Sequence, residues 1–168
     1  MSAIDLIVLG MIKEKEQSAY DLQKNVEYRN ISKWIKVSTP SIYKKVVQLE
    51  EKGYIKGNMS EKSIYHITEK GNKYFLELMK KISAQMINIF LDFNAVIINL
   101  EMVSPLERKE LTENIECQIR EFQKAVSGLE EERTDIPFTG KTILKQQVLL
   151  SEALNKWIEN FRELYLEE

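Results

Sequence analysis

The first third of the chain contains three short runs in which apolar residues recur every three or four positions. This spacing places apolar side chains on one face of a helix, so it predicts three short helices. The expected inward-facing positions are Ile4, Ile7, Val8 and Met11 in the first, Ala19, Leu22 and Val26 in the second, and Ile42, Val46 and Leu49 in the third. The pairs Ser2/Asp5 and Ser18/Asp21 have the spacing of capping boxes, which mark helix starts.

The third run has the clearest limits. Either Ser38 or Thr39 is suited to be its N-cap, and Pro40 follows at a position where a missing N–H costs nothing. Gly53 is expected to end the helix in the left-handed conformation. Ser41, Lys44, Lys45 and Gln48 are expected on its outer face.

Two short apolar runs then flank a polar turn. Residues 54–56 and 63–67 predict strands, and residues 57–62 between them predict a turn. Thr68 is expected to cap the helix that follows. Three helices and a hairpin within about 70 residues are the arrangement of a winged helix-turn-helix domain, in which the hairpin is the wing.

Beyond Tyr74 the pattern lengthens into three apolar stripes, over residues 75–100, 111–129 and 143–164. They predict long amphipathic helices, the first of which could be one helix or two. Such helices cannot easily bury their apolar faces alone, so pairing with a second copy is expected. The predicted fold class is mainly α with a small β-hairpin wing: a winged helix-turn-helix domain over residues 1–74 and C-terminal dimerisation helices over residues 75–168.

Charge is divided unevenly between these parts. Residues 1–74 hold 13 Lys and Arg against 9 Asp and Glu, whereas residues 75–168 hold 11 against 17. Polar residues interrupt the most apolar stretch, 86–103, so no membrane span is expected. The lone cysteine, Cys117, and an N-terminus without the features of a signal peptide indicate a cytoplasmic protein.

The third helix carries the candidate DNA-binding residues. A recognition helix reads base edges in the major groove with side chains near its N-terminus. Hydroxyl groups and lysines suit both phosphate and base contacts. The candidates for double-stranded DNA are therefore Thr39, Ser41, Tyr43, Lys44, Lys45 and Gln48, with Lys62 at the wing tip.

The run from Thr39 to Ile55 resembles the core of the PadR family, with its Pro–x–apolar–Tyr start and Leu-Glu followed by a Gly-apolar exit. Residues 63–71 resemble the second wing strand and the Thr-x-x-Gly of that family, and residues 19–22 resemble its second-helix opening. The C-terminal part resembles more loosely the subgroup with an extended helical tail, which includes a virulence-gene activator. The resemblance implies a bacterial regulator, usually a repressor, that binds a near-palindromic operator as a homodimer, with Tyr43 and its neighbours on the DNA.

Two departures from that family stand in this chain. Ala19 replaces a glycine that often precedes the tyrosine of the second helix, and the turn over residues 57–62 is shorter and poorer in arginine. The second departure weakens the expected wing contact but not that of the recognition helix.

No pattern indicates an enzyme, a metal site or a cofactor. His66, the only histidine, lies in the second predicted wing strand, and Cys117 is expected to be a buried, inert thiol. Met86, Phe90, Phe93, Trp157 and Phe161 are candidates for a pocket that binds a small aromatic or hydrophobic effector, although the same side chains would equally make a plain core. Two alternatives to the regulator remain open: a winged helix used for protein–protein interaction, and a ligand-sensing module without operator binding.

Overall fold

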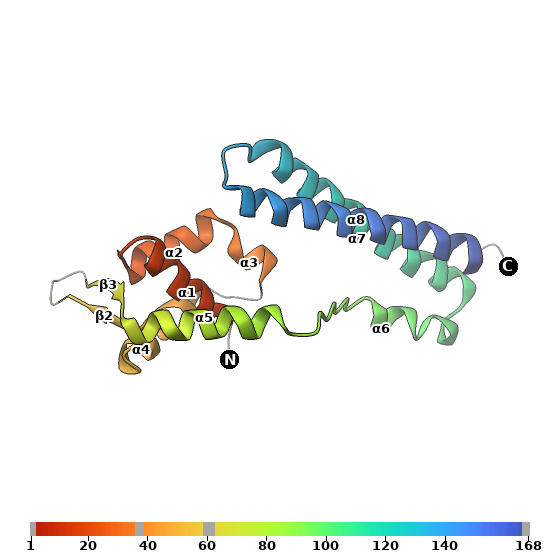
Figure 1. Cartoon of the computed structure of the whole chain (residues 1–168). Coiled ribbons are helices and arrows are strands. Elements are labelled where there is room, and N and C mark those ends of the chain that lie inside the picture. Colours follow the sequence, from red (N-terminus) through yellow and green to blue (C-terminus); the bar gives the residue numbers. More distant parts are fainter. Residues whose placement is uncertain (1–2, 36–38, 59–62, 166–168) are drawn as a thin grey trace. The chain divides into compact units, whose positions relative to one another are not determined.

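The computed structural model describes residues 3–35, 39–58 and 63–165. The chain divides into two compact units, Met1–Ile87 and Asn88–Glu168 (Figure 1). The elements of the first unit are α1 (Ala3–Glu14), β1 (Gln17–Ser18), α2 (Ala19–Tyr28), α3 (Ile31–Trp34), α4 (Thr39–Glu51), β2 (Ile55–Gly57), β3 (Ile64–Ile67) and α5 (Glu69–Ser83). The elements of the second are α6 (Asn94–Ile97), the 3-10 turn η1 (Leu100–Met102), α7 (Pro105–Glu132) and α8 (Phe138–Tyr165).

The first unit is a winged helix-turn-helix domain, as the apolar spacing predicts. Its core forms where α1, α2, α4 and α5 meet, because each helix turns one apolar stripe inward. The fully buried members of that core include Val8, Leu9, Leu22, Val26, Ile42, Val46, Leu49, Ile55 and Leu78. The mainly α fold class with a small β wing is thereby confirmed.

The sheet has three strands rather than the two of the predicted hairpin. Its order is β1-β3-β2, and both pairings are antiparallel. Strand β1 consists of only two residues, Gln17 and Ser18, which pair with Tyr65 and Ile64. Ser18 also caps α2 by accepting a hydrogen bond from the backbone N–H of Asp21 at 3.1 Å. A two-residue strand directly before a cap has no periodicity, so the sequence pattern does not detect it.

Tight connections fix the wing to the helices. Gly53 has a φ of +71°, and the N–H of Tyr54 donates to the carbonyl of Leu49 at 2.9 Å, which ends α4 in the predicted left-handed cap. Thr68 caps α5 as expected, accepting from the N–H of Gly71 at 3.0 Å, and its hydroxyl donates to the carbonyl of Gly53 at 2.7 Å. These hydrogen bonds therefore fix the wing where the chain enters it, at Gly53 and Tyr54, and where the chain leaves it, at Thr68.

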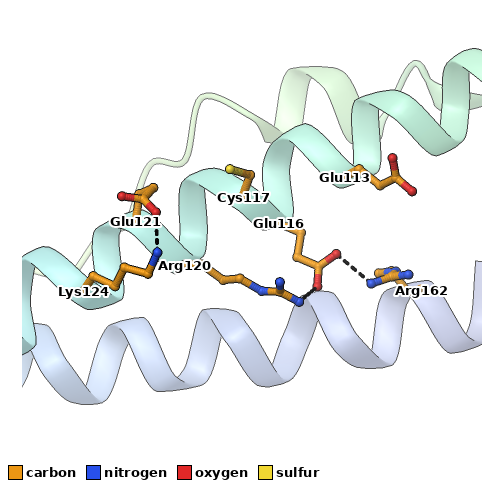
Figure 2. Close-up of a pocket in the computed structure, with 7 residues that line it drawn as sticks. All are labelled: Glu113, Glu116, Cys117, Arg120, Glu121, Lys124 and Arg162. Atoms are coloured by element: carbon orange, nitrogen blue, oxygen red, sulfur yellow. Dashed lines mark hydrogen bonds and ion pairs between the residues drawn. The ribbon is translucent and has the colours of Figure 1, made fainter.

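The second unit is built on the hairpin of α7 and α8. Ser104 and Glu107 form the capping box at the start of α7, and Ile115, Ile119 and Ile158 form the centre of the core. Glu116 is buried at this interface, and its carboxylate accepts from Arg120 on its own helix and from Arg162 on α8 (Figure 2). Among the described residues, no helix combines the length and the apolar character needed to cross a bilayer.

The stripe over residues 75–100 does not form a long helix. Helix α5 ends at Ser83, an extended segment follows, and only the four residues of α6 return to helix. The open question is thus answered as two helices, and the first of them, α5, belongs to the first unit. Residues 86–91 are apolar except for Asn88, so a helix there would lack a polar face, and Asn88 and Asp92 favour turns.

Candidate nucleic-acid interface

Helix α4 packs one face into the core and exposes the opposite face to solvent. Ile42, Val46 and Leu49 are at most 1 % exposed, so the helix cannot rotate without opening the core. The opposite face presents Tyr43, Lys44 and Val47, and Tyr43 and Val47 are 42 % and 52 % exposed. A rigid helix with an exposed face of mixed chemistry is the geometry of a recognition helix.

Lys45 is not on that open face, which corrects the prediction of an outward-facing side chain. Its ammonium lies 2.8 Å from Oδ1 of Asp5 in α1, and the two side chains are only 18 % and 8 % exposed. The helical period explains this placement, because at about 100° per residue Lys45 lies roughly 60° from Ile42, on the flank of the buried stripe. The proximity to the stripe was readable from the sequence, but the buried partner was not.

The other predicted contact residues fall into two groups. Ser41 and Gln48 are half-buried along the opposite flank from Tyr43. Thr39 is the first residue of α4, but its side chain, like all of Lys62, lies outside the described part of the structure. Val47 was not among the predicted residues, although its position opposite the buried stripe was a sufficient signal.

The wing is tied to the end of the recognition helix. The carboxylate of Glu50 accepts a hydrogen bond from the N–H of Gly57 at 2.9 Å. Burial first, and then the Glu50 charge, raises the pKa of the Tyr65 phenol on β3. Lys56 is exposed at the base of the wing. Positions on α4 and the wing base are therefore fixed relative to each other.

The predicted effector residues are only partly brought together. Phe93, Trp157 and Phe161 stack in a row in the second unit, with ring centroids 5.5 and 5.6 Å apart. A cavity of about 460 Å³ lies beside them, and its lining includes Phe93, Asn94 and Trp157. Met86 and Phe90 do not join this cluster, since their side chains are 84 % and 87 % exposed.

His66 and Cys117 lie in different units of the chain. His66 is half-buried within β3, as expected for a strand residue. Cys117 is exposed, which corrects the expectation of a buried thiol. Figure 2 shows its side chain on the side of α7 that faces away from α8, apart from the Glu116 ion pairs.

Comparison with known proteins agrees with this geometry. Residues 8–86, nearly the whole first unit, match the Transcriptional regulator PadR-like family. The first unit belongs to the PadR-like family. The similar solved structures extend the likeness of fold to the second unit as well, because they cover almost the entire chain. No curated protein matches the sequence.

Three solved structures show how far that likeness extends. PadR of Bacillus subtilis in complex with operator DNA is 18% identical, with 98% of both chains covered and a TM-score of 0.78. The same protein in complex with p-coumaric acid gives 17% identity, coverage of 98% and 99%, and a TM-score of 0.84. The virulence activator AphA of Vibrio cholerae is 14% identical, with 99% and 100% covered and a TM-score of 0.78. At these identities the likeness establishes the PadR fold for both units.

Proposed function

We propose that this protein is a sequence-specific, DNA-binding transcription regulator and not an enzyme, with α4 as its recognition helix. The observation that carries the proposal is the anchoring of α4 by Ile42, Val46 and Leu49, which leaves Tyr43, Lys44 and Val47 exposed. A winged-helix neighbour of the same fold has been crystallised on operator DNA. The basic balance of the first unit, 15 Lys and Arg against 10 Asp and Glu, favours a polyanion as partner.

Each exposed side chain of α4 has a matching chemistry on double-stranded DNA. The Lys44 ammonium suits a phosphate or the acceptors of guanine, and the Tyr43 hydroxyl suits a phosphate. The methyl groups of Val47 suit the C5-methyl of thymine. Ser41 and Gln48 flank this surface. Thr39 and Lys62, whose side chains lie outside the described part of the structure, are retained as proposed contacts to the DNA.

We further propose that the protein acts in the cytoplasm as a homodimer on a near-palindromic operator and represses transcription. Large exposed apolar side chains concentrate between residues 86 and 106, and a monomer rarely leaves so many uncovered. They are Met86, Ile87, Ile89, Phe90, Ile98, Met102 and Leu106. Two heads held by the C-terminal helices would read half-sites about one helical turn apart.

The test is a fluorescence-anisotropy titration with the DNA upstream of the protein's own gene. Lys44→Glu reverses one exposed charge on α4 and should weaken binding at least tenfold, because a phosphate or base contact becomes a repulsion. Lys80→Glu makes the same change in net charge on the exposed surface of α5 and should bind within about twofold of the wild type.

Equal losses in the two variants would reduce the interaction to nonspecific charge attraction. No competitor-resistant binding by the wild type would favour a winged helix that serves a protein partner, or a ligand-sensing module that has no operator.

We also propose that the cavity beside Trp157 receives a small aromatic effector. Its wall is apolar apart from Asn94, and the aromatic side chains of Phe93 and Trp157 line it. A structural neighbour has been solved with p-coumaric acid. Phe93 and Phe161 complete the stacked row, whereas Met86 and Phe90 are more suitable for an interface than for this cavity.

Tryptophan fluorescence can test the effector site directly. Trp34 is replaced by Phe so that only Trp157 reports, and p-coumaric acid is used as the probe. Saturable quenching that disappears in Leu154→Phe, whose larger ring occupies part of the cavity without adding a second indole, would support the site. Linear quenching with no saturation in both proteins would exclude it for this ligand class.

A further inference from the structure

A chain of partly buried contacts links the recognition helix to two other helices of the first unit. Lys45 of α4 lies 2.8 Å from Oδ1 of Asp5 in α1. The other oxygen of that carboxylate, Oδ2, accepts a hydrogen bond from the hydroxyl of Tyr74 in α5 at 3.2 Å. The Tyr74 ring in turn stacks on Tyr54, which leads from α4 into the wing, with centroids 4.2 Å apart.

This arrangement is unusual for a surface lysine. Asp5 is 6 % exposed, and a buried carboxylate is stable only when a charge or hydrogen bonds compensate it. Its Oδ1 has no hydrogen bond of good geometry among the described residues, so the lysine ammonium is its main compensation. Two apolar residues could fill the same space, but they would lack the charge attraction between Lys45 and Asp5 and the directional hydrogen bond from Tyr74 to Oδ2.

We infer that Asp5, Lys45 and Tyr74 are positioning residues that set the orientation of the recognition helix for DNA without touching DNA themselves. This inference rests on the proposed function. Lys45 is held on the inner flank of α4, whereas its neighbour Lys44 is exposed and available to phosphate. The two adjacent lysines thus have opposite tasks: Lys45 points into the domain and Lys44 points out of it.

Salt dependence of DNA binding distinguishes a positioning lysine from a contacting one. Each phosphate neutralised by a lysine contributes about 0.9 to the slope of log affinity against log salt. Lys44→Met should therefore reduce the slope by about one. Lys45→Met and Asp5→Asn should lower operator affinity about tenfold at every salt concentration and leave the slope unchanged.

Two results would overturn the inference. A slope reduced by about one in Lys45→Met, with normal binding by Asp5→Asn, would place Lys45 on a phosphate. Wild-type affinity in both variants, measured where circular dichroism shows them folded, would reduce the network to a contribution to stability. Tyr74→Phe keeps the stacked ring and removes one hydroxyl, so it supplies a milder variant if the charge changes prevent folding. It should lower affinity by about two- to fivefold with the slope unchanged, and unchanged affinity would count against the network.

Hydrogen exchange tests the positioning without DNA, so failure of the proposed function can be recognised separately. Asp5→Asn should accelerate amide exchange in α4 by tenfold or more while α2 changes much less, since α2 makes none of these contacts. The wild type could bind no DNA while Asp5→Asn still accelerates exchange selectively in α4. In that case the regulator proposal fails, and the network remains the contact that positions α4. If α4 and α2 accelerate equally, the network has no specific hold on α4, and the inference fails.

Discussion

Asp5 shows that a side chain can make contacts that its sequence position does not predict. The Ser2/Asp5 spacing predicts a capping box, and Ser2 lies outside the described residues. That prediction is therefore untested, and among the described residues the carboxylate of Asp5 contacts Lys45 and Tyr74. Spacing within a helix specifies neighbours on that helix, and both partners of Asp5 come from helices that are distant in sequence. The same limit explains why the sequence did not predict the buried partner of Lys45.

Tyr74 gives this network a signature at high pH. Burial, and after it the Asp5 carboxylate, raises the pKa of Tyr74 to about 12, whereas an unfolded tyrosine ionises near 10. A raised pKa means that the folded state holds the proton more tightly, so this contribution to stability is complete below about pH 10 and is lost as the pH rises toward 12. We expect the free energy of unfolding, measured with urea, to fall across that window.

The control is Tyr74→Phe, which has no ionisable group at this position. It should be less stable than the wild type by about 1 kcal/mol near neutral pH, for the lost hydrogen bond. The difference between the two proteins should then shrink from pH 10 to 12. A difference that stays constant across this range would show that Tyr74 titrates normally in the folded state.

At the scale of elements, the first unit depends on the close approach of α5 to the end of α4. A Cβ on Gly71 would lie 1.9 Å from the carbonyl oxygen of Tyr54, so any larger residue must separate the helix from the wing base. Gly71→Ala should therefore destabilise the protein by roughly 1–3 kcal/mol or more, as overpacking does. Thermal denaturation of the purified variant measures it.

Gly128 is the matched control for this substitution. It lies inside α7, and the position that a Cβ would take there is open space, so Gly128→Ala should stabilise the helix by about 0.5–1 kcal/mol. A Gly71→Ala protein as stable as the wild type would mean that the α5–wing junction is free to shift.

Sequence pattern predicted the elements whose causes are local. The apolar stripes of α1, α2 and α4, the cap at Thr68 and the left-handed Gly53 follow from period and capping chemistry, and all are present. The extended segment before α6 was not predicted, because its apolar residues match a helical period without the polar face that a surface helix needs. Strand β1 was missed because two residues pair only when β3 is already in place.

The candidate site residues also divide into those that a local sequence pattern predicts and those that it does not. Tyr43 and Lys44 could be named in advance, since the buried stripe of α4 leaves them outside. The position of Lys45 beside the buried stripe follows from the helical period, but its partner, a carboxylate 40 residues earlier in the chain, is not contained in any local pattern. The structure brings Phe93, Trp157 and Phe161 together in one stacked row, whereas the side chains of Met86 and Phe90 are exposed.

At the scale of the whole molecule, the two units differ in net charge, and this difference agrees with DNA binding by the first unit. The first unit is basic, and the remaining residues, 88–168, hold 9 Lys and Arg against 16 Asp and Glu. An acidic second unit is repelled by DNA, which favours approach through the first unit alone. The exposed apolar side chains between residues 86 and 106 then remain available for a second copy.

Self-association should therefore depend on this apolar segment. Phe90 is 87 % exposed and lies within it, whereas Phe138, at the start of α8, is 83 % exposed and lies outside it. Sedimentation equilibrium should show a wild-type dimer, a largely monomeric Phe90→Asp protein, and a dimeric Phe138→Asp protein. A buried, unpaired carboxylate strongly opposes an interface, which is why the same change has different consequences at the two positions.

Operator binding should follow the oligomeric state, because a dimer joins two half-site contacts into one event. Phe90→Asp should bind a full operator at least a hundredfold more weakly than the wild type, while its affinity for an isolated half-site stays within about threefold. If Phe90→Asp remained dimeric and Phe138→Asp dissociated, the interface would lie at the start of α8 instead. If both proteins stayed dimeric with full operator affinity, neither exposed phenylalanine would belong to the surface that joins the two DNA-binding heads.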